Sequence, residues 1–285
     1  MPSSRILPEF DLLLPESVDE AVKMLAEYKD AVTVMAGGTD VIVSATQGFV
    51  TDKVMSLAKV PGLSYIKDEA DGVKIGAMTT LQDAADSAVI KDKFPALYKS
   101  AFINGTPQTR NMGTVAGNIL RASPSGDCAC ALYALGATIV FQSVSGTREV
   151  SVDDFFKGYK EINRNADELA IEIKIPAAAT KNAFHRINRT TLDLSKINCA
   201  VALTMDGDTI SAARIAMGAV AATTLRLAKS EALLAGKKVS DDVLAQVADS
   251  VAEQIAPIDD VRSTAEYRLD VAGVLLKRTI QEAVA

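Results

Sequence analysis

The chain has 285 residues, of which 48% are hydrophobic and 23% charged, and its formal net charge is −6. This composition is typical of a soluble globular protein with two or three compact units. It excludes nucleic acid as a partner, because phosphate backbones are bound through clustered Lys and Arg, and the sequence has no such cluster.

Other broad classes are excluded by what the sequence lacks. No apolar stretch approaches the roughly 20 residues that span a bilayer, and the first residues lack a signal-peptide pattern. We therefore expect no integral membrane segment and a cytoplasmic location. Cys128, Cys130 and Cys199 cannot form a disulfide framework, which fits a reducing compartment. With His185 as the single histidine, we predict no metal site.

The N-terminal part alternates helices and strands. Residues 17–28 have the helical 3.6-residue period, with Ser17 as N-cap and Glu20 completing a capping box. A strand at 32–35 runs into Ala36-Gly-Gly-Thr-Asp40, and 41–45 begins a helix. Further along, the pattern predicts strands at 53–58 and 74–77 and helices at 80–87, capped by Thr80, and at 97–102.

Residues 103–124 contain Gly105, Pro107, Gly113, Gly117 and Pro124, which predicts one long loop without regular structure. Such a loop usually carries function. After it we expect a helix at 130–136 and strands at 138–142, 148–152 and 170–175, with a hairpin at 145–146. Residues 176–180 are a predicted boundary.

The last part predicts a small antiparallel sheet with helices. Strands at 200–206 and 209–217 flank a turn at 206–208, and amphipathic helices are expected at 230–235, 240–255 and 265–284. The sequence has no internal repeat.

Two glycine-containing loops carry the chemistry: Ala36 to Asp40, and Thr114-Val-Ala-Gly-Asn118 continuing to Asp127. Backbone N–H groups at a glycine turn before a helix form a donor site for phosphate. Gly37 and Gly38 allow close approach, Thr39 adds a hydroxyl, and Asp40 is expected to be a helix N-cap. Asp127 is a candidate acceptor for ribose hydroxyls. Plain tight turns, and helix capping by Asp127, are the alternatives.

Neither loop matches a Rossmann or P-loop motif. Instead, A-G-G-T-D and the run from Pro107 to Asp127, P-Q-x-R-N-x-G-T-x-x-G-N-I-x-x-A-S-P-x-x-D, resemble the FAD-binding medium subunit of the molybdenum hydroxylases. This family includes carbon monoxide dehydrogenase and xanthine dehydrogenase. The resemblance covers essentially the whole chain.

The resemblance implies an α/β (α+β) chain with a two-part FAD-binding fold of the vanillyl-alcohol-oxidase type. The expected divisions are a first FAD-binding subdomain at 1–58, a second at 59–177, and a C-terminal α/β domain at 178–285. The flavin is expected to lie between them.

The resemblance also implies which residues hold FAD. The pyrophosphate is expected at Met35, Ala36, Gly37, Gly38, Thr39, Asp40 and Val41. The rest of the ADP portion is expected at Thr114, Ala116, Gly117, Asn118 and Asp127, with Asn104 as another flavin contact and Ala170 near the adenine. Asp193 and Leu194 match the segment that passes the isoalloxazine, and His185 matches a position that is lysine in some relatives.

Several of these residues have plainer interpretations. The alternative for His185 is a surface or strand residue, and for Leu194 a core residue, while Arg110 is a candidate flavin-tuning charge or a surface ion-pair partner. Ala116 replaces the usual glycine of the family, and its retention predicts a negative φ at that position.

The functional expectation is an oxidoreductase subunit that transfers electrons through FAD and has no catalytic residues of its own. By resemblance, its partners are a large molybdenum–pterin subunit and a small [2Fe–2S] subunit, in a dimer of heterotrimers. The external acceptor is NAD, quinone, ferredoxin or oxygen. The alternatives are a self-sufficient FAD-dependent oxidase and a flavin-free structural subunit.

Overall fold

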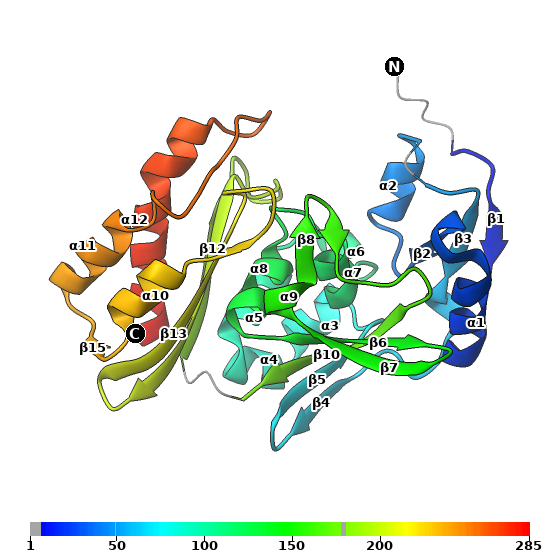
Figure 1. Cartoon of the computed structure of the whole chain (residues 1–285), viewed down its shortest axis with the longest axis horizontal. Coiled ribbons are helices and arrows are strands. Elements are labelled where there is room, and N and C mark those ends of the chain that lie inside the picture. Colours follow the sequence, from blue (N-terminus) through cyan, green and yellow to red (C-terminus); the bar gives the residue numbers. More distant parts are fainter. Residues whose placement is uncertain (1–6, 49, 178–180) are drawn as a thin grey trace.

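The computed structural model describes residues 7–48, 50–177 and 181–285. Three sheets lie in a row along the long axis of the molecule, and helices fill the spaces between them and cover one end (Figure 1). This arrangement bears out the mixed α/β (α+β) class, whereas the domain boundaries at 58/59 and 177/178 stay predictions. Part of the predicted boundary at 176–180 lies outside the described residues.

The first sheet is small and parallel, with the strand order β1-β3-β2. Its strands are β1 (Asp11–Leu13), β2 (Val32–Met35) and β3 (Lys53–Ser56). Helix α1 (Val18–Tyr28) buries Ala21, Val22 and Leu25 in a core shared with this sheet. The predicted strand at 53–58 stops at Ser56, whose hydroxyl accepts from the N–H of Ala58 and starts a 3-10 turn, Leu57–Lys59.

The predicted capping box of α1 is only half correct. The Ser17 hydroxyl accepts from the backbone N–H of Glu20 at 3.1 Å, as expected of an N-cap. The Glu20 carboxylate, however, accepts from the N–H of Glu16 at 2.7 Å rather than from Ser17. The complete box occurs in α3 (Leu81–Asp86), where Thr80 and Asp83 bond reciprocally.

The second sheet is antiparallel, with the order β4-β5-β10-β6-β7. Its strands are β4 (Ile66–Glu69), β5 (Gly72–Gly76), β6 (Thr138–Ser143), β7 (Gly146–Ser151) and β10 (Leu169–Pro176). A separate hairpin is formed by β8 (Phe156–Gly158) and β9 (Glu161–Ile162). The remaining helices of this part are α2 (Val41–Ala45), α4 (Ala88–Lys93), α5 (Pro95–Phe102), α6 (Pro107–Arg110), α7 (Val115–Leu120), α8 (Asp127–Ala134) and α9 (Val152–Phe155).

The prediction of an unstructured loop at 103–124 was wrong, because α6 and α7 lie within it. Each helix is a short turn started by a threonine. Thr106 caps α6, which has Pro107 at its first position, and Thr114 caps α7. Proline is compatible with a first helical turn, so the dense Gly and Pro pattern marked helix ends rather than an absence of helix.

The third sheet is antiparallel, with the order β11-β12-β13-β14 and β15 paired to β13. Its strands are β11 (Lys181–Ile187), β12 (Ile197–Asp206), β13 (Thr209–Gly218), β14 (Leu225–Arg226) and β15 (Lys237–Lys238). Its helices are α10 (Ala228–Leu234), α11 (Asp241–Asp249) and α12 (Ala265–Val284). The predicted helix at 240–255 thus ends at Asp249.

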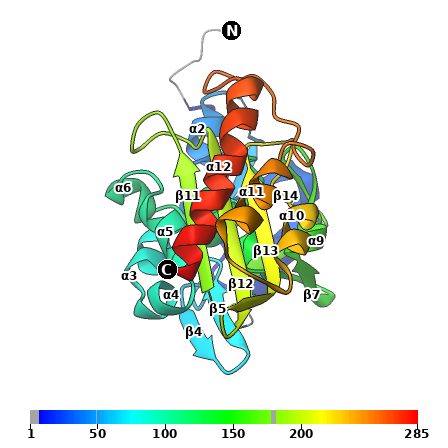
Figure 2. The ribbon, with the colours of Figure 1, turned by 90° about the vertical axis from the view of Figure 1, so that its left-hand side faces the viewer.

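Both faces of this sheet are buried. Side chains alternate along each strand, so one face contributes Phe184, Ala200 and Ala216 to the core formed with α5 and α8. The opposite face contributes Cys199, Val201 and Ile215 to a core under α10, α11 and α12. Figure 2 shows α12 running across this outer face. Packing of the inner face therefore fixes the position of this sheet relative to the two glycine-containing loops.

Replacing Phe184 tests this junction. Phe184 lies on β11, has 0% exposure and packs in the core of the preceding part of the chain. Phe184→Ala should lower the free energy of unfolding by about 3–5 kcal/mol, from lost burial and the cavity left behind. Urea denaturation provides the measurement. Phe102→Ala on α5, where the side chain is half exposed, is the matched control with a smaller loss. Equal losses for the two variants would contradict the assignment.

Candidate functional site

A cleft of about 1250 Å³ is lined by residues from all three sheets and from the loops between them. Its volume exceeds the roughly 300–1,000 Å³ of a site for a drug-sized ligand. The structure brings together at this cleft most of the residues predicted from sequence: Ala36, Gly37, Gly38, Thr39, Asp40, Val41, Asn104, Thr114, Ala116, Gly117, Asn118, Asp127, Ala170, Asp193 and Leu194.

The first glycine loop connects β2 to α2. Gly38 has φ +73, a left-handed conformation that glycine adopts without strain. Gly37 is required for a different reason: a Cβ there would overlap the backbone carbonyl of Met112, two residues before the second loop. The first loop therefore touches the segment that leads into the second, as expected for two parts of one site, and no side chain larger than hydrogen fits between them.

Five successive backbone N–H groups in this loop have no acceptor. Among the residues that the structure describes, none accepts from the N–H of residues 37–41, although the next amide, that of Ile42, donates to the Gly38 carbonyl at 3.0 Å. All five residues line the cleft. Successive free N–H groups at a glycine turn before a helix form a concave donor site, so this run can bind an anionic, acceptor-rich ligand.

Asp40 takes the N-cap position of α2, as predicted, but its side chain makes no capping bond. Instead, its carboxylate forms an ion pair with Arg121, which also lines the cleft. Arg121 donates in addition to the Ser44 hydroxyl at 3.4 Å. The negative charge of Asp40 is thus compensated beside the free amides.

The second loop is organised by two side-chain caps. The Thr114 hydroxyl accepts from the Gly117 N–H at 2.9 Å and starts α7. The Asn118 amide oxygen accepts from the Ala129 N–H at 3.1 Å and so caps the following helix, α8. Ala116 lies within α7 and is absent from the positive-φ residues, which confirms the predicted negative φ.

One wall of the cleft comes from β10 and the β8–β9 hairpin. Ala170 lies at the cleft as predicted, and beside it Glu168 is 5% exposed. Arg148 binds both oxygens of Glu168, at 2.7 and 2.6 Å. Burial raises the pKa of Glu168, but these bonds and one from the Asn165 N–H more than offset burial, so the pKa lies below its usual value.

Asp127 lines the cleft as predicted, and its carboxylate is held by protein donors. It is 4% exposed at the first turn of α8, and its carboxylate accepts from Arg186 at 2.5 Å, Ser195 at 2.6 Å and Asn198 at 2.7 Å. A carboxylate offers about four acceptor sites. Three are therefore occupied by protein donors. The residue at the N-cap position is Gly126, so the alternative of helix capping by the Asp127 side chain was wrong.

Residues 188–195 form a loop with two large apolar side chains at the cleft, Leu192 and Leu194. They are 58% and 53% exposed, so the interpretation of Leu194 as core was wrong. Between them, Asp193 pairs with Arg189 at 3.0 Å. The loop presents apolar surface to whatever occupies the cleft.

A second buried arginine supports the neighbouring loop, residues 256–263. Arg268 on α12 is 2% exposed and donates to the carbonyls of Lys196 and Ile258, at 2.9 and 2.5 Å. It also pairs with Asp260 at 2.8 Å. Burial raises the pKa of Asp260, but the bond from Arg268 and two backbone N–H bonds lower it below its usual value.

Two predicted residues are not among those that line the cleft, Met35 and His185. Met35 ends β2, and its sulfur packs near Gly38. The ring of His185 contacts Glu282 of α12, which also binds Lys99 at 2.8 Å. Because neighbouring residues of a strand face opposite sides, Arg186 and not His185 points to the cleft. The interpretation of His185 as a strand residue away from the flavin fits this placement.

Sequence reasoning missed the basic and aromatic residues of the cleft. These are Arg121, Tyr159, Lys160, Arg164, Arg186, Arg262 and Arg268. Arg110, expected as either a flavin-tuning charge or a surface ion-pair partner, is bonded to Gln82 at 3.0 Å and to the Gly105 carbonyl and is not among the residues that line the cleft. Recognition of β11 as a strand would have separated His185 from Arg186 by their alternating faces.

The three cysteine thiols are all buried at 0% exposure. Burial raises the pKa of Cys128 and of Cys199 to about 12, and it raises the pKa of Cys130 well above its usual value. Across the described ranges, no three His, Cys, Asp or Glu side chains gather closely enough to hold a metal ion. None of the described helices combines the length and apolar character that crossing a bilayer requires.

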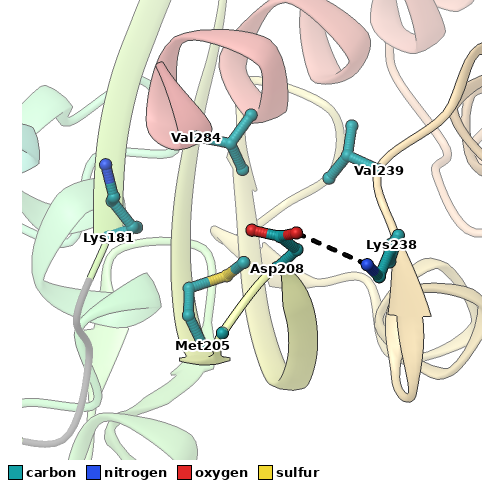
Figure 3. A pocket seen from close by; sticks show the side chains of 7 residues that line it. Lys181, Met205, Asp208, Lys238, Val239 and Val284 are labelled. Carbon is teal, nitrogen blue, oxygen red and sulfur yellow. Dashed lines mark hydrogen bonds and ion pairs between the residues drawn. The ribbon is translucent and has the colours of Figure 1, made fainter.

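A smaller pocket of about 630 Å³ lies at the far end of the third sheet (Figure 3). Lys181, Met205, Asp208 and Val284 line it, and Lys238 pairs with Asp208 at 3.4 Å. None of the predicted site residues belongs to it.

Comparisons with known proteins agree with this geometry. The family model described as the FAD binding domain in molybdopterin dehydrogenase matches residues 8–178. The model described as the CO dehydrogenase flavoprotein C-terminal domain matches residues 182–283.

Two curated relatives match over nearly their whole length. The glyceraldehyde dehydrogenase medium chain of Sulfolobus acidocaldarius is 33% identical, with 96% of this chain and 98% of that protein covered. The carbon monoxide dehydrogenase medium chain of Hydrogenophaga pseudoflava is 32% identical, with 98% and 99% covered. A solved structure of carbon monoxide dehydrogenase from the same organism superposes with a TM-score of 0.94, at 32% identity and 98% coverage of each chain.

The Arg148–Glu168 pair gives a pH-dependent prediction. Because the folded-state pKa of Glu168 is lowered, the pair stabilises the fold above the unfolded pKa, about 4.3, and loses this effect as pH falls further. Arg148→Gln should therefore lower the free energy of unfolding by about 1.5–3 kcal/mol at neutral pH. The difference from the unsubstituted chain should shrink once the pH falls below about 4.

Urea denaturation at several pH values measures this difference. The control is Lys174→Gln, which breaks an exposed pair with Glu149 and should cost about 0–1 kcal/mol. A loss for Arg148→Gln that is the same at neutral and acid pH would contradict the role given to Glu168.

Proposed function

Since the chain belongs to the family of FAD-binding medium subunits of the molybdenum hydroxylases, we propose that it relays electrons within such a complex. It is an oxidoreductase subunit with FAD as its cofactor. In the proposal, electrons come from the [2Fe–2S] clusters of a partner subunit and leave to an external acceptor, which is NAD, quinone, ferredoxin or oxygen.

The observation that carries the proposal is the run of unpaired backbone N–H groups at residues 37–41. A pyrophosphate offers several negatively charged oxygens, and successive amides bind such a group without a counter-charge. Thr39 adds a hydroxyl at the same point of the cleft. These residues therefore fit the diphosphate of FAD, and the cleft volume of about 1250 Å³ leaves room for its two ring systems.

The remaining parts of the cleft suit the rings. Ala170 and the β8–β9 hairpin, with Tyr159 and Lys160, form one wall, and Leu192 and Leu194 present apolar side chains from another. A bound flavin accepts two electrons and releases them singly or as a pair. The chain itself holds and orients the cofactor and excludes water from the buried parts of the cleft.

Substrate oxidation is assigned to another subunit. Within the described residues, the cleft contains no histidine and no cysteine, which are the usual general base and nucleophile at oxidase and hydrolase sites. Of the six carboxylates that line it, all but Asp30 are paired with an arginine: Asp40, Asp127, Glu168, Asp193 and Asp260. This pairing speaks against the self-sufficient oxidase.

The proposed partners are a large molybdenum–pterin subunit and a small [2Fe–2S] subunit, assembled as a dimer of heterotrimers. The names of the relatives support a multisubunit assembly, because each is a medium chain. We propose a cytoplasmic location for the complex, which three free thiols in the chain support.

Replacing Gly37 tests the cofactor site. The purified chain should be yellow and contain one FAD, and Gly37→Val should lose FAD, because its Cβ would collide with the Met112 carbonyl and separate the two loops. The flavin absorbance per chain measures the effect. Gly62→Ala is the control: no heavy atom lies within 4 Å, so its only cost is about 1–2 kcal/mol from the positive φ of +79, and it should keep its FAD.

Unsubstituted chain that stays colourless when FAD is added would refute the cofactor assignment. FAD retained at full occupancy by Gly37→Val would refute the assignment of the loop. The relay is tested by isolating the chain and asking whether molybdenum and iron–sulfur partner subunits copurify with it. Oxidation of a small substrate by the flavoprotein alone would instead favour the self-sufficient oxidase.

A further inference from the structure

We propose that Asp127 is a positioning residue, whose carboxylate fixes the loop of residues 188–195 so that Leu192 and Leu194 face the cofactor. The inference rests on the proposed function, because it takes FAD as the occupant of the cleft. It assigns to Asp127 a task other than the binding of ribose.

The three donors to Asp127 all come from the C-terminal part of the chain, whereas Asp127 itself belongs to α8. Arg186 lies on β11, Asn198 on β12, and Ser195 ends the loop of residues 188–195. One buried carboxylate therefore joins a helix of the FAD-binding part to two strands and a loop of the third sheet.

Arg186 extends the same connection. Its side chain is 7% exposed and, besides Asp127, it donates to the carbonyls of Ile103 at 2.9 Å and Thr191 at 2.7 Å. Asp127 fixes the orientation of the guanidinium, since a buried arginine requires a charged partner. Thr191 and Ser195 are thus both held, one through Arg186 and one directly.

These two anchors bracket the residues that face the cleft. Leu192, Asp193 and Leu194 lie between them. Within the described part of the chain, the other hydrogen bonds and ion pairs of residues 188–195 stay inside that segment, such as Asn188 to the Thr190 carbonyl at 2.5 Å and Arg189 to Asp193 at 3.0 Å. The position of both leucines therefore depends on Asp127.

The bonding capacity of the carboxylate supports this role over ribose binding. Oδ1 already accepts from Ser195 and Asn198, and Oδ2 from Arg186. Of about four acceptor sites, one remains. A positioning role uses the three bonds that exist, whereas the ribose role rests on the one that is left.

The experiment compares Ser195→Ala and Asp127→Asn with a control, Ser211→Ala. Ser195→Ala removes one anchor and keeps the buried Asp127–Arg186 pair, so it tests the proposal even where Asp127→Asn fails to fold. Ser211 lies on β13, outside the cleft lining, and its hydroxyl likewise makes one bond, to the Thr204 carbonyl. The full-length chain is used throughout.

Three measurements are made. Amide hydrogen exchange over residues 188–196 reports on the loop with and without FAD. Titration with FAD gives its dissociation constant, and visible circular dichroism reports on the surroundings of the bound flavin. Leu194→Ala is made alone and together with Ser195→Ala. If Ser195→Ala has already displaced the loop, Leu194 no longer contributes to FAD binding there, and its removal should not change the dissociation constant further.

We expect faster exchange of the loop in Ser195→Ala and Asp127→Asn, even without FAD, and a dissociation constant raised by about five- to twentyfold. The flavin dichroism should change in both variants and stay unchanged in Ser211→Ala. Leu194→Ala should weaken FAD binding in the unsubstituted chain and have little added effect beside Ser195→Ala.

Two results would overturn the proposal. One is normal loop exchange and flavin dichroism in Ser195→Ala. The other is loss of FAD binding in Asp127→Asn while Ser195→Ala binds normally, which would make Asp127 a direct ligand. Failure of the unsubstituted chain to bind FAD would refute the proposed function alone, since loop exchange without FAD still tests the anchors.

Discussion

The burial of the third sheet on both faces is the constraint on which the cleft depends. Its inner face carries alanines at positions 200, 202 and 216, and such small side chains let α5 and α8 approach closely. The outer face is covered by α10, α11 and α12. Because neither face is free, the strands cannot slide, and the loops that leave them reach the cleft at fixed points. A ligand enclosed between the parts of the chain requires that rigidity.

The cleft itself is built with two different kinds of contact. At residues 36–41 the chain offers backbone N–H groups, and the shape of this loop depends on the absence of side chains at Gly37 and Gly38. On the opposite side it offers side chains held by buried arginines, Arg186 and Arg268, which bind carbonyl groups of the two irregular loops. Backbone amides suit a charged, invariant group such as a diphosphate. Because the arginines bind backbone carbonyl groups of these loops, the apolar side chains of the loops can be changed without loss of those bonds.

What could be predicted from the sequence follows this division. The glycine loops were found because glycine turns next to strands are local patterns, and most of the residues that the resemblance named lie at the cleft. Arg186 and Arg268 were missed because a single arginine in a strand or helix has no local signature, and its partners, such as Ile103, are up to 83 residues away in sequence. His185 was named from the resemblance alone, and because one step along a strand reverses the face, it is its neighbour Arg186 that lines the cleft. The helices α6 and α7 were missed because Gly and Pro mark ends of short helices as well as loops.

The burial of the three cysteines has a chemical consequence for a flavoprotein. Reduced flavin that meets oxygen, one of the proposed acceptors, produces peroxide close to the protein, and peroxide attacks thiolates in preference to thiols. Cys128, Cys130 and Cys199 are inaccessible, and their raised pKa values keep them protonated at neutral pH. None of the three cysteines is therefore placed for oxidation to sulfenic acid.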